Sequence, residues 1–175
     1  MTTVDLKPVS EILPQAERIV SRVFAQLSAL LPDAELHHIG ATALPGGVTK
    51  GDVDVLVLVS TARFPAAVAA LRRDFAVRQP DNWTAEFASF GNDTGHELPL
   101  GLQVVVKDSE GDFLLFLRDH LLANPEVLAE YNRLKRAHAG EGAEGYWQAK
   151  DAFFSRVLAA RAVSRPAQGQ AKGTG

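Results

Sequence analysis

The sequence predicts a single α/β domain of the α+β type, with a small mixed β-sheet, helices packed on it and a C-terminal helical segment. Residues 53–59 form a nearly continuous β-branched and aliphatic run, which is typical of a strand buried on both faces. A helical pattern at 64–75 and two further strand patterns, at 84–90 and 100–107, follow it. From residue 111 onward the apolar spacing is helical.

The segments before this central strand predict a helix and a short strand. Apolar residues recur at helical spacing over 10–31, with Ser10 as a plausible N-cap. Residues 36–39 form a short strand pattern that ends at Gly40. The segment 42–51 contains a Pro-Gly-Gly sequence, so we expect it to lack regular structure.

The C-terminal part predicts three helices, at about 112–123, 125–138 and 144–162. Asn124 and the following proline suit the N-cap and first position of the second helix. A polar, glycine-rich tail follows, and we expect it to be disordered. The predicted domain therefore covers residues 1–163 and the predicted tail residues 164–175.

Composition excludes several classes of protein. Apolar residues make up 46% of the chain and charged residues 22%, which is ordinary for a globular protein. The net charge of −3 argues against extended nucleic-acid binding. No cysteine is present, which excludes disulfides, thiolate metal sites and a cysteine nucleophile. The N-terminus lacks the features of a signal peptide and no apolar run is long enough to span a membrane, so we expect a cytoplasmic protein that does not bind membranes.

Two carboxylates stand at the start of the central strand. Asp52 and Asp54 are two residues apart, so in a strand both side chains point to the same face. A hard cation such as Mg²⁺ between them would relieve their repulsion, and it could also bind substrate phosphates. The alternative is structural, with Asp52 in a turn and Asp54 capping a neighbour. Asp54 favours the metal, because an unpaired carboxylate in an apolar strand is costly.

A glycine turn precedes the aspartates. Gly40, Ala41 and Thr42 would let the backbone approach a ligand closely, and the Thr42 hydroxyl could contact a phosphate. Ten residues separate Ala41 from Asp52. No Walker A motif, dinucleotide fingerprint or nucleophile elbow is present.

Two lysines in the C-terminal helices are candidate phosphate ligands. Tyr131 and Lys135 are four residues apart, as are Tyr146 and Lys150, so each pair shares one helix face beside an apolar stripe. Either lysine could reach a phosphate chain at the sheet. The alternative is that each extends its ammonium group to the solvent. The histidines show no metal-ligand spacing, and His38 is a candidate for a catalytic or, more simply, a structural role.

The sequence Ile39-Gly40-Ala41-Thr42, followed after ten residues by Asp52-Val53-Asp54-Val55, resembles the signature of the nucleotidyltransferase superfamily. Within that superfamily the chain is similar to GrpB-like proteins. The residues that carry this similarity are His38 to Gly46, Lys50, Leu117 to Leu121, Asn124 to Glu126, Tyr131 to Lys135, Tyr146, Lys150 and Phe153.

The resemblance implies a nucleotidyltransferase-like fold in which Asp52 and Asp54 bind Mg²⁺. Phosphate contacts would come from the turn and from cationic side chains, namely Gly40, Ala41, Thr42, Lys50, Lys135 and Lys150. The implied substrate is a nucleoside triphosphate, and the acceptor is an unknown small molecule or protein. Two departures stand against this. Ala41 replaces a serine, and Gln103 lies where superfamily enzymes often place a third carboxylate.

Three functions therefore remain as hypotheses. The first is a Mg²⁺-dependent nucleotidyltransferase that transfers an NMP group from an NTP to the acceptor. The second is a nucleotide-binding module that has lost catalysis, which Ala41 and Gln103 suggest. The third is a non-enzymatic interaction or accessory domain whose pocket is structural.

Overall fold

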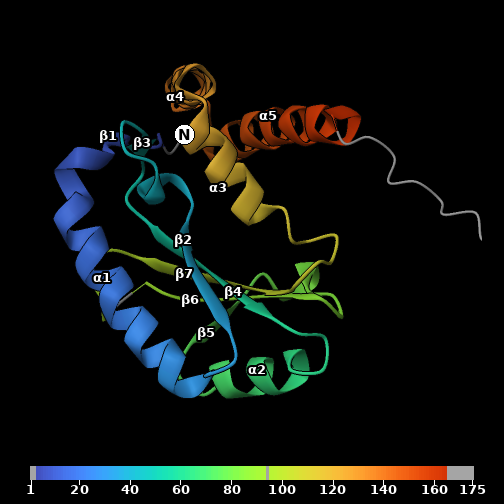
Figure 1. Ribbon diagram of the computed structural model, residues 1–175. Coiled ribbons are helices and arrows are strands. Elements are labelled where there is room, and N and C mark those ends of the chain that lie inside the picture. The colour runs from blue at the N-terminus through green and yellow to red at the C-terminus, as the bar shows by residue number, and fades with distance from the viewer. Residues whose placement is uncertain (1–2, 94, 165–175) are drawn as a thin grey trace, which may run out of the picture.

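The structure is a computed structural model that describes residues 3–93 and 95–164. Its centre is a five-stranded mixed sheet of order β2-β4-β7-β6-β5, in which β4 and β7 are parallel and the other neighbours are antiparallel (Figure 1). The strands are β2 (Glu35–Ile39), β4 (Val53–Val59), β5 (Ala76–Arg78), β6 (Phe87–Asn92) and β7 (Leu100–Val106). The helices are α1 (Val9–Leu30), α2 (Phe64–Leu71), α3 (Leu114–Ala123), α4 (Pro125–His138) and α5 (Gly142–Ser164).

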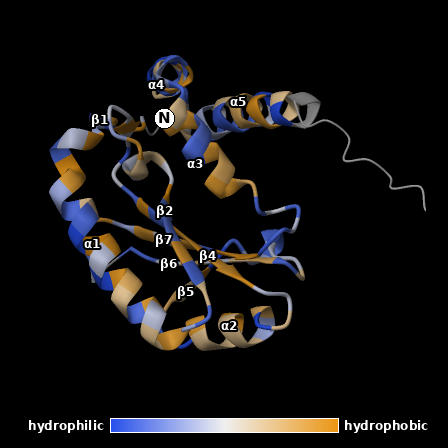
Figure 2. Ribbon diagram, viewed as in Figure 1, coloured by the Kyte–Doolittle hydropathy of each residue, from blue (hydrophilic) through white to orange (hydrophobic). Residues whose placement is uncertain are grey.

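Helices α1 and α2 cover one face of the sheet. Alternation along β4 directs Val53, Val55, Val57 and Val59 to this face. They pack against apolar side chains of both helices, including Ile19 of α1. This main core explains why hydrophobic residues are concentrated along the central strands and α2 in Figure 2.

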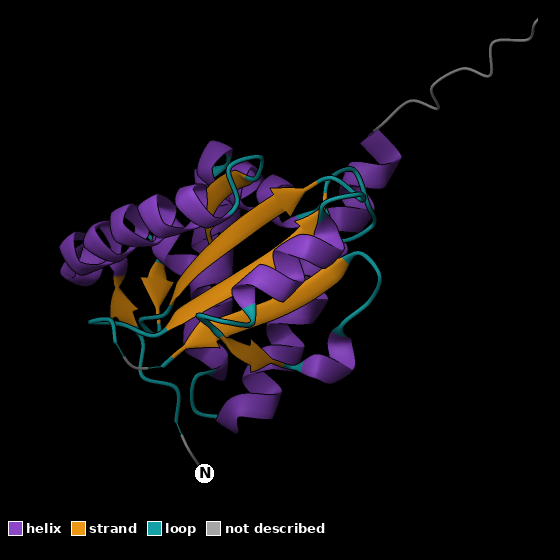
Figure 3. Ribbon diagram, turned by 90° about the horizontal axis from the view of Figure 1, so that it is seen from below, coloured by secondary structure: helices purple, strands orange, loops and turns teal. Residues whose placement is uncertain are grey.

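The other face of the sheet is covered less completely. A small cluster of Ile39, Leu56, Leu58 and Val105 meets the first turn of α3. Helices α3, α4 and α5 then pack on one another around a separate cluster that contains Leu121, Tyr131 and Phe153. The three helices lie at one end of the molecule, away from α2 (Figure 1), and Figure 3 shows the sheet from below. Asp54 lies on this less covered face.

The predicted fold class is confirmed, with differences at particular elements. The segment 42–51 was expected to lack regular structure, yet it contains the two-residue strand β3 (Val48–Thr49), which pairs with β1 (Lys7–Pro8). A short 3₁₀ helix, η1 (Ala41–Ala43), precedes it. Strand β5 was not predicted, because it has only three residues and two of them are exposed.

Three helix boundaries also differ from the sequence prediction. Helix α1 begins at Val9 after Pro8, so Ser10 lies inside the helix and is not its N-cap. Helix α2 ends at Leu71 rather than at residue 75. Helix α5 extends to Ser164, which had been assigned to the tail, and the rest of the predicted disordered tail lies outside the described residues. In the part of the chain that the structure describes, no helix is both long and apolar enough to cross a membrane.

Candidate functional site

Asp54 lies between two glycines, Gly40 directly after β2 and Gly101 on β7. Register pairs Ile39 of β2 and Gly101 of β7 with Asp54 of β4. A Cβ atom added at Gly101 would lie 2.5 Å from Asp54 Oδ1, and one added at Gly40 would lie 2.5 Å from Asp54 Oδ2. Gly40 also has a φ of 74°, which L side chains rarely adopt. Both carboxylate oxygens therefore need glycine beside them.

The surroundings of Asp54 favour its protonated form. Burial, and then the neighbouring charge of Asp52, raise its pKa to about 6. A hydrogen bond from Gln103 and the charges of Lys150 and Lys50 oppose this rise. Asp54 is not sealed from solvent, since it retains partial exposure at the base of a cleft. A bound cation would therefore be favoured beside this carboxylate.

Three residues surround Asp52 at the mouth of the cleft. Lys50 Nζ lies 3.0 Å from Asp52 Oδ2. Trp147 of α5 has 45% of its surface exposed, with Lys50 Nζ 5.0 Å and Lys150 Nζ 4.1 Å from its ring centroid. Burial lowers the pKa of Lys150, while Asp52 and Asp54 partly counteract this. Two ammonium groups and two carboxylates thus meet at one place.

The cleft has a volume of about 1210 Å³ and lies between the open face of the sheet and helices α3 and α5. Of the predicted site residues, the ones that line it are Gly40, Ala41, Lys50, Asp52, Asp54 and Lys150. The structure therefore brings together the turn, both aspartates and two of the three lysines. This volume exceeds what one nucleotide-sized ligand requires.

Lys135 was predicted to contact a phosphate, and the structure places it elsewhere. Its relative exposure is 0%, and its ammonium group donates a hydrogen bond to the Val48 backbone oxygen. The same group lies 4.2 Å from the centroid of the Tyr131 ring. Burial lowers the pKa of Lys135 to about 7. Lys135 does not line the cleft, and it holds β3 against α4.

Thr42 was also predicted to contact a phosphate through its hydroxyl group. Thr42 is 1% exposed, and its Oγ1 lies 2.9 Å from His38 Nε2 in a hydrogen bond. Burial, and then the charge of Arg118, lower the pKa of His38 to about 4, so this imidazole is neutral near pH 7. Arg118 Nη1 in turn donates to the His38 backbone oxygen at 3.0 Å. The hydrogen bond between Thr42 and His38 therefore stabilises the turn, and neither residue lines the cleft.

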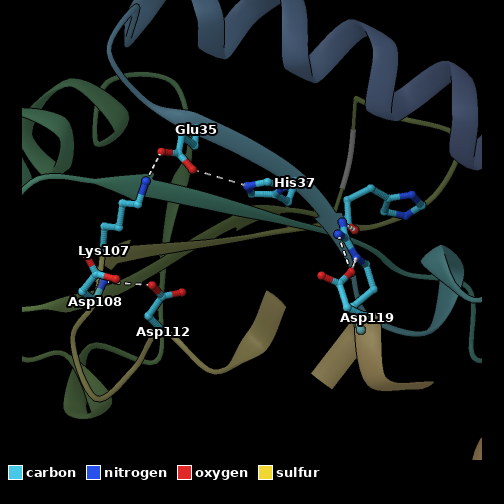
Figure 4. Close-up of polar contacts among 8 residues, drawn as sticks. Glu35, His37, Lys107, Asp108, Asp112 and Asp119 are labelled. Atoms are coloured by element: carbon cyan, nitrogen blue, oxygen red, sulfur yellow. Dashed lines mark hydrogen bonds and ion pairs between the residues drawn. The ribbon is translucent and has the colours of Figure 1, made fainter. Parts of the chain in front are cut away.

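His37 points to the face of β2 opposite to that of His38, as the alternation of side chains along a strand predicts. Figure 4 shows it directed toward Glu35, which is also paired with Lys107. Asp119 is labelled near the end of β2 in the same view, where it accepts hydrogen bonds from Arg118. His37 does not line the cleft. The ion pairs around it therefore belong to the surface rather than to the candidate site.

The residues fit a divalent cation only in part. In the described portion of the chain, no group of three or more His, Asp or Glu side chains is placed to bind a metal. Two carboxylates nevertheless converge, and burial, followed by the charge of Asp52, raises the pKa of Asp54. Gln103 presents its amide nitrogen to Asp54, because it is the hydrogen-bond donor there. The Gln103 Oε1 atom is buried and has no hydrogen-bond partner.

Sequence reasoning missed two residues of this site, Gly101 and Trp147. Gly101 was read only as part of a strand, although a glycine inside a strand often marks a close approach of another group. Trp147 directly follows Tyr146 in the sequence, but no function was predicted for it. Gln103, which the sequence places where a third carboxylate is often found, directs its amide nitrogen to Asp54.

The GrpB protein family matches residues 4–160 of this sequence. The chain belongs to the GrpB family. A UPF0157 protein of Vibrio cholerae is 36% identical to it over 149 residues, which cover 85% of this chain and 78% of that protein. The family that the sequence motifs indicated is therefore confirmed.

A solved structure confirms the GrpB fold. The crystal structure of the conserved protein GrpB from Enterococcus faecalis gives a TM-score of 0.69 at 19% identity, covering 89% of this chain and 96% of that one. The Cid1 poly(U) polymerase with bound MgGTP gives a TM-score of 0.47 at 13% identity, covering 70% of this chain and 41% of that one. At this low similarity no inference about activity follows.

Proposed function

We propose that this GrpB-family protein is a Mg²⁺-dependent nucleotidyltransferase that transfers an NMP group from an NTP to an acceptor. One observation carries the proposal. Asp54 and Asp52 stand together in a cleft of about 1210 Å³, and Lys50 and Lys150 lie at the same place. Two carboxylates suit a hard cation, and two ammonium groups suit the phosphates that such a cation accompanies. The likeness of the Gly40 turn and the two aspartates to the nucleotidyltransferase signature agrees with this.

The residues would act mainly by positioning. Asp52 and Asp54 would hold Mg²⁺, which when bound neutralises charge on the triphosphate. Lys50 and Lys150 would bind phosphate oxygens, and the bare backbone at Gly40 lets a phosphate come close. The acceptor oxygen would form a bond to the α-phosphorus as the bond to the β-phosphate oxygen breaks. Pyrophosphate then leaves, and the acceptor's proton passes to solvent.

A second candidate is a nucleotide-binding module without transfer activity. Gln103 favours it, because its amide nitrogen faces Asp54 and adds no third anionic ligand beside the aspartates. Ala41 favours it too, since it supplies no hydroxyl group in the turn. A module of this kind would bind nucleotide and Mg²⁺ at the same residues.

The test is calorimetric titration of the full chain with ATP, GTP, CTP and UTP, with and without Mg²⁺. We expect binding that requires Mg²⁺ and that Asp54→Asn abolishes. Lys150→Ala should weaken binding about tenfold, in line with the loss of one charge-assisted contact. Lys135→Met serves as the matched control, and it should leave the affinity within about twofold.

Pyrophosphate release then separates the two candidates. Release that is lost in Asp52→Asn and Asp54→Asn would establish transfer, with folding of each variant checked by circular dichroism. Binding without release in the presence of candidate acceptors would favour the binding module. No binding at millimolar nucleotide would refute both candidates.

A further inference from the structure

The cleft continues beyond the aspartates, across the sheet toward its β5 edge. Register places Asp54, Gly101 of β7 and Gly91 of β6 side by side on one face. Neighbouring side chains cover both glycines: a Cβ atom added at Gly101 would lie 2.5 Å from Asp54 Oδ1, and Gly91 is buried beneath Arg78. Gly101 lines the cleft, whereas Gly91 does not. The strip open to a ligand is therefore the part of the cleft beside Gly101 and Gln103, and a flat group could lie there next to the aspartates.

Arg78 forms the far wall of this strip. A Cβ atom added at Gly91 would lie 3.2 Å from Arg78 Nε, so the arginine side chain lies over that glycine. The Arg78 backbone oxygen accepts hydrogen bonds from Trp83 Nε1 at 2.9 Å and from Ser89 Oγ at 2.8 Å. These two bonds hold the Arg78 backbone, and the Arg78 side chain is held by its ion pair with Asp93 at 2.6 Å.

A polar atom without a partner faces this part of the site. Gln103 is two residues beyond Gly101 on β7, so both lie on the same face of the sheet. Its Oε1 is buried and accepts no hydrogen bond, whereas its nitrogen donates to Asp54. A buried acceptor without a donor is costly, so a ligand that carries a donor would be favoured here. Opposite the strip, Leu114 and Leu117 of α3 line the cleft.

The charges at this end do not suit a phosphate backbone. Arg78 lines this end and is already paired with Asp93 at 2.6 Å, while Arg118, at the β2 side of the cleft, is paired with Asp119 at 2.6 Å. Glu86 and Glu110 also line the cleft and add negative charge. A polynucleotide needs unpaired cations along its path. An uncharged ligand does not.

We propose that the space bounded by Gly101, Gln103, Arg78, Leu114 and Leu117 is the acceptor subsite, and that it takes a flat, uncharged small molecule with a hydrogen-bond donor. The proposal rests on the proposed function, because an acceptor must lie beside the aspartates that hold the nucleotide. It names the acceptor class, which the site residues alone leave open.

The test uses indole and benzofuran, which share a shape and differ in one N–H donor. Each is titrated into the isotope-labelled full chain without nucleotide, and amide shifts are followed by NMR. We expect indole to shift the amides of Gly101 and Gln103 and to bind about threefold to tenfold more tightly than benzofuran. In Gln103→Met this preference should disappear.

A matched pair of variants on α3 locates the site. Leu114 lines the cleft, whereas Leu122 is 45% exposed and does not line it. Leu114→Gln should weaken indole binding at least about threefold, and Leu122→Gln should leave it unchanged. Equal effects of the two variants, or an unchanged preference in Gln103→Met, would overturn the assignment of this space.

Competition experiments decide between occupants. Displacement of indole by MgATP would show that the space belongs to the nucleotide, and shifts of the same amides by hexa-adenylate RNA would show a nucleic-acid acceptor. Either result refutes the proposal. If nucleotides bind elsewhere in the cleft and indole does not bind, the acceptor proposal alone fails. Indole binding to a chain that binds no nucleotide would refute the acceptor role together with the proposed function.

Discussion

The two Tyr–Lys pairs of the C-terminal helices have the same spacing and different environments. Lys135 on α4 is fully buried, and it donates to the Val48 backbone oxygen. Lys150 on α5 keeps partial exposure in the cleft, where Asp52 and Asp54 act on its pKa. Spacing places a lysine on a helix face, but the element packed against that face decides its role. Here β3 covers Lys135, and the open cleft leaves Lys150 available to a ligand.

The largest expected effect is the difference between these two lysines in their contribution to the free energy of unfolding. Lys135→Ala removes a buried alkyl chain and leaves the Val48 oxygen without its donor. We expect a loss of about 2–4 kcal/mol in the free energy of unfolding, measured by urea denaturation. Lys150→Ala should lose less than about 1 kcal/mol, because the lysine is partly exposed and already loses hydration in the fold.

A second variant tests whether lost buried volume alone explains the destabilisation in Lys135→Ala. Lys135→Met keeps most of the buried volume and removes only the ammonium group, so it should recover more than half of the stability lost in Lys135→Ala. If Lys150→Ala destabilised the protein as much as Lys135→Ala, the contrast between a structural and a ligand-facing lysine would be wrong.

The next prediction concerns the pH dependence of the free energy of unfolding, to which Asp54 contributes differently from surface carboxylates. Because its pKa in the fold, about 6, lies above its unfolded value of 3.8, the folded state binds more protons between these values. Asp54 therefore lowers stability progressively as pH rises from about 4 to 6, and the full penalty remains above pH 6. We expect Asp54→Asn to be more stable than the natural chain by about 1–3 kcal/mol at pH 8 and equal to it near pH 3.5.

The measurement is urea unfolding of both proteins across this pH range. Taking the difference between them removes the contribution of other carboxylates, such as Glu35 and Glu97, whose pKa values are lowered by Lys107 and Arg18. Mg²⁺ at pH 8 should stabilise the natural chain and have little effect on the variant. A constant difference at every pH would contradict the raised pKa.

The sequence predicted the strands of five or more residues, and it failed at the strands of two or three residues. Val53–Val59 was read correctly because its apolar run has few alternatives. Strands β3 and β5 have two and three residues, too few for a periodic signal. Their pairing depends on segments far along the chain, which local patterns do not report.

The candidate site was predictable to a similar extent. Asp52 and Asp54 could be assigned to one face because alternation in a strand is local geometry. Gly101 could not be linked to Asp54, since that contact depends on the register of β4 with β7. The direction of the Thr42 hydroxyl group could not be predicted either, because a turn of this type can direct it toward the cleft or away from it.

The smallest expected effect concerns that hydroxyl. Thr42→Val preserves shape and removes the hydrogen bond to His38 Nε2. We expect a loss of about 1 kcal/mol in the free energy of unfolding, because one buried hydrogen bond is lost. Nucleotide affinity, measured by the same calorimetric titration, should stay within about twofold, as for Lys135→Met. A tenfold loss of affinity with unchanged stability would instead mean that the hydroxyl turns toward a bound phosphate, and that Thr42 belongs with Lys150 rather than with Lys135.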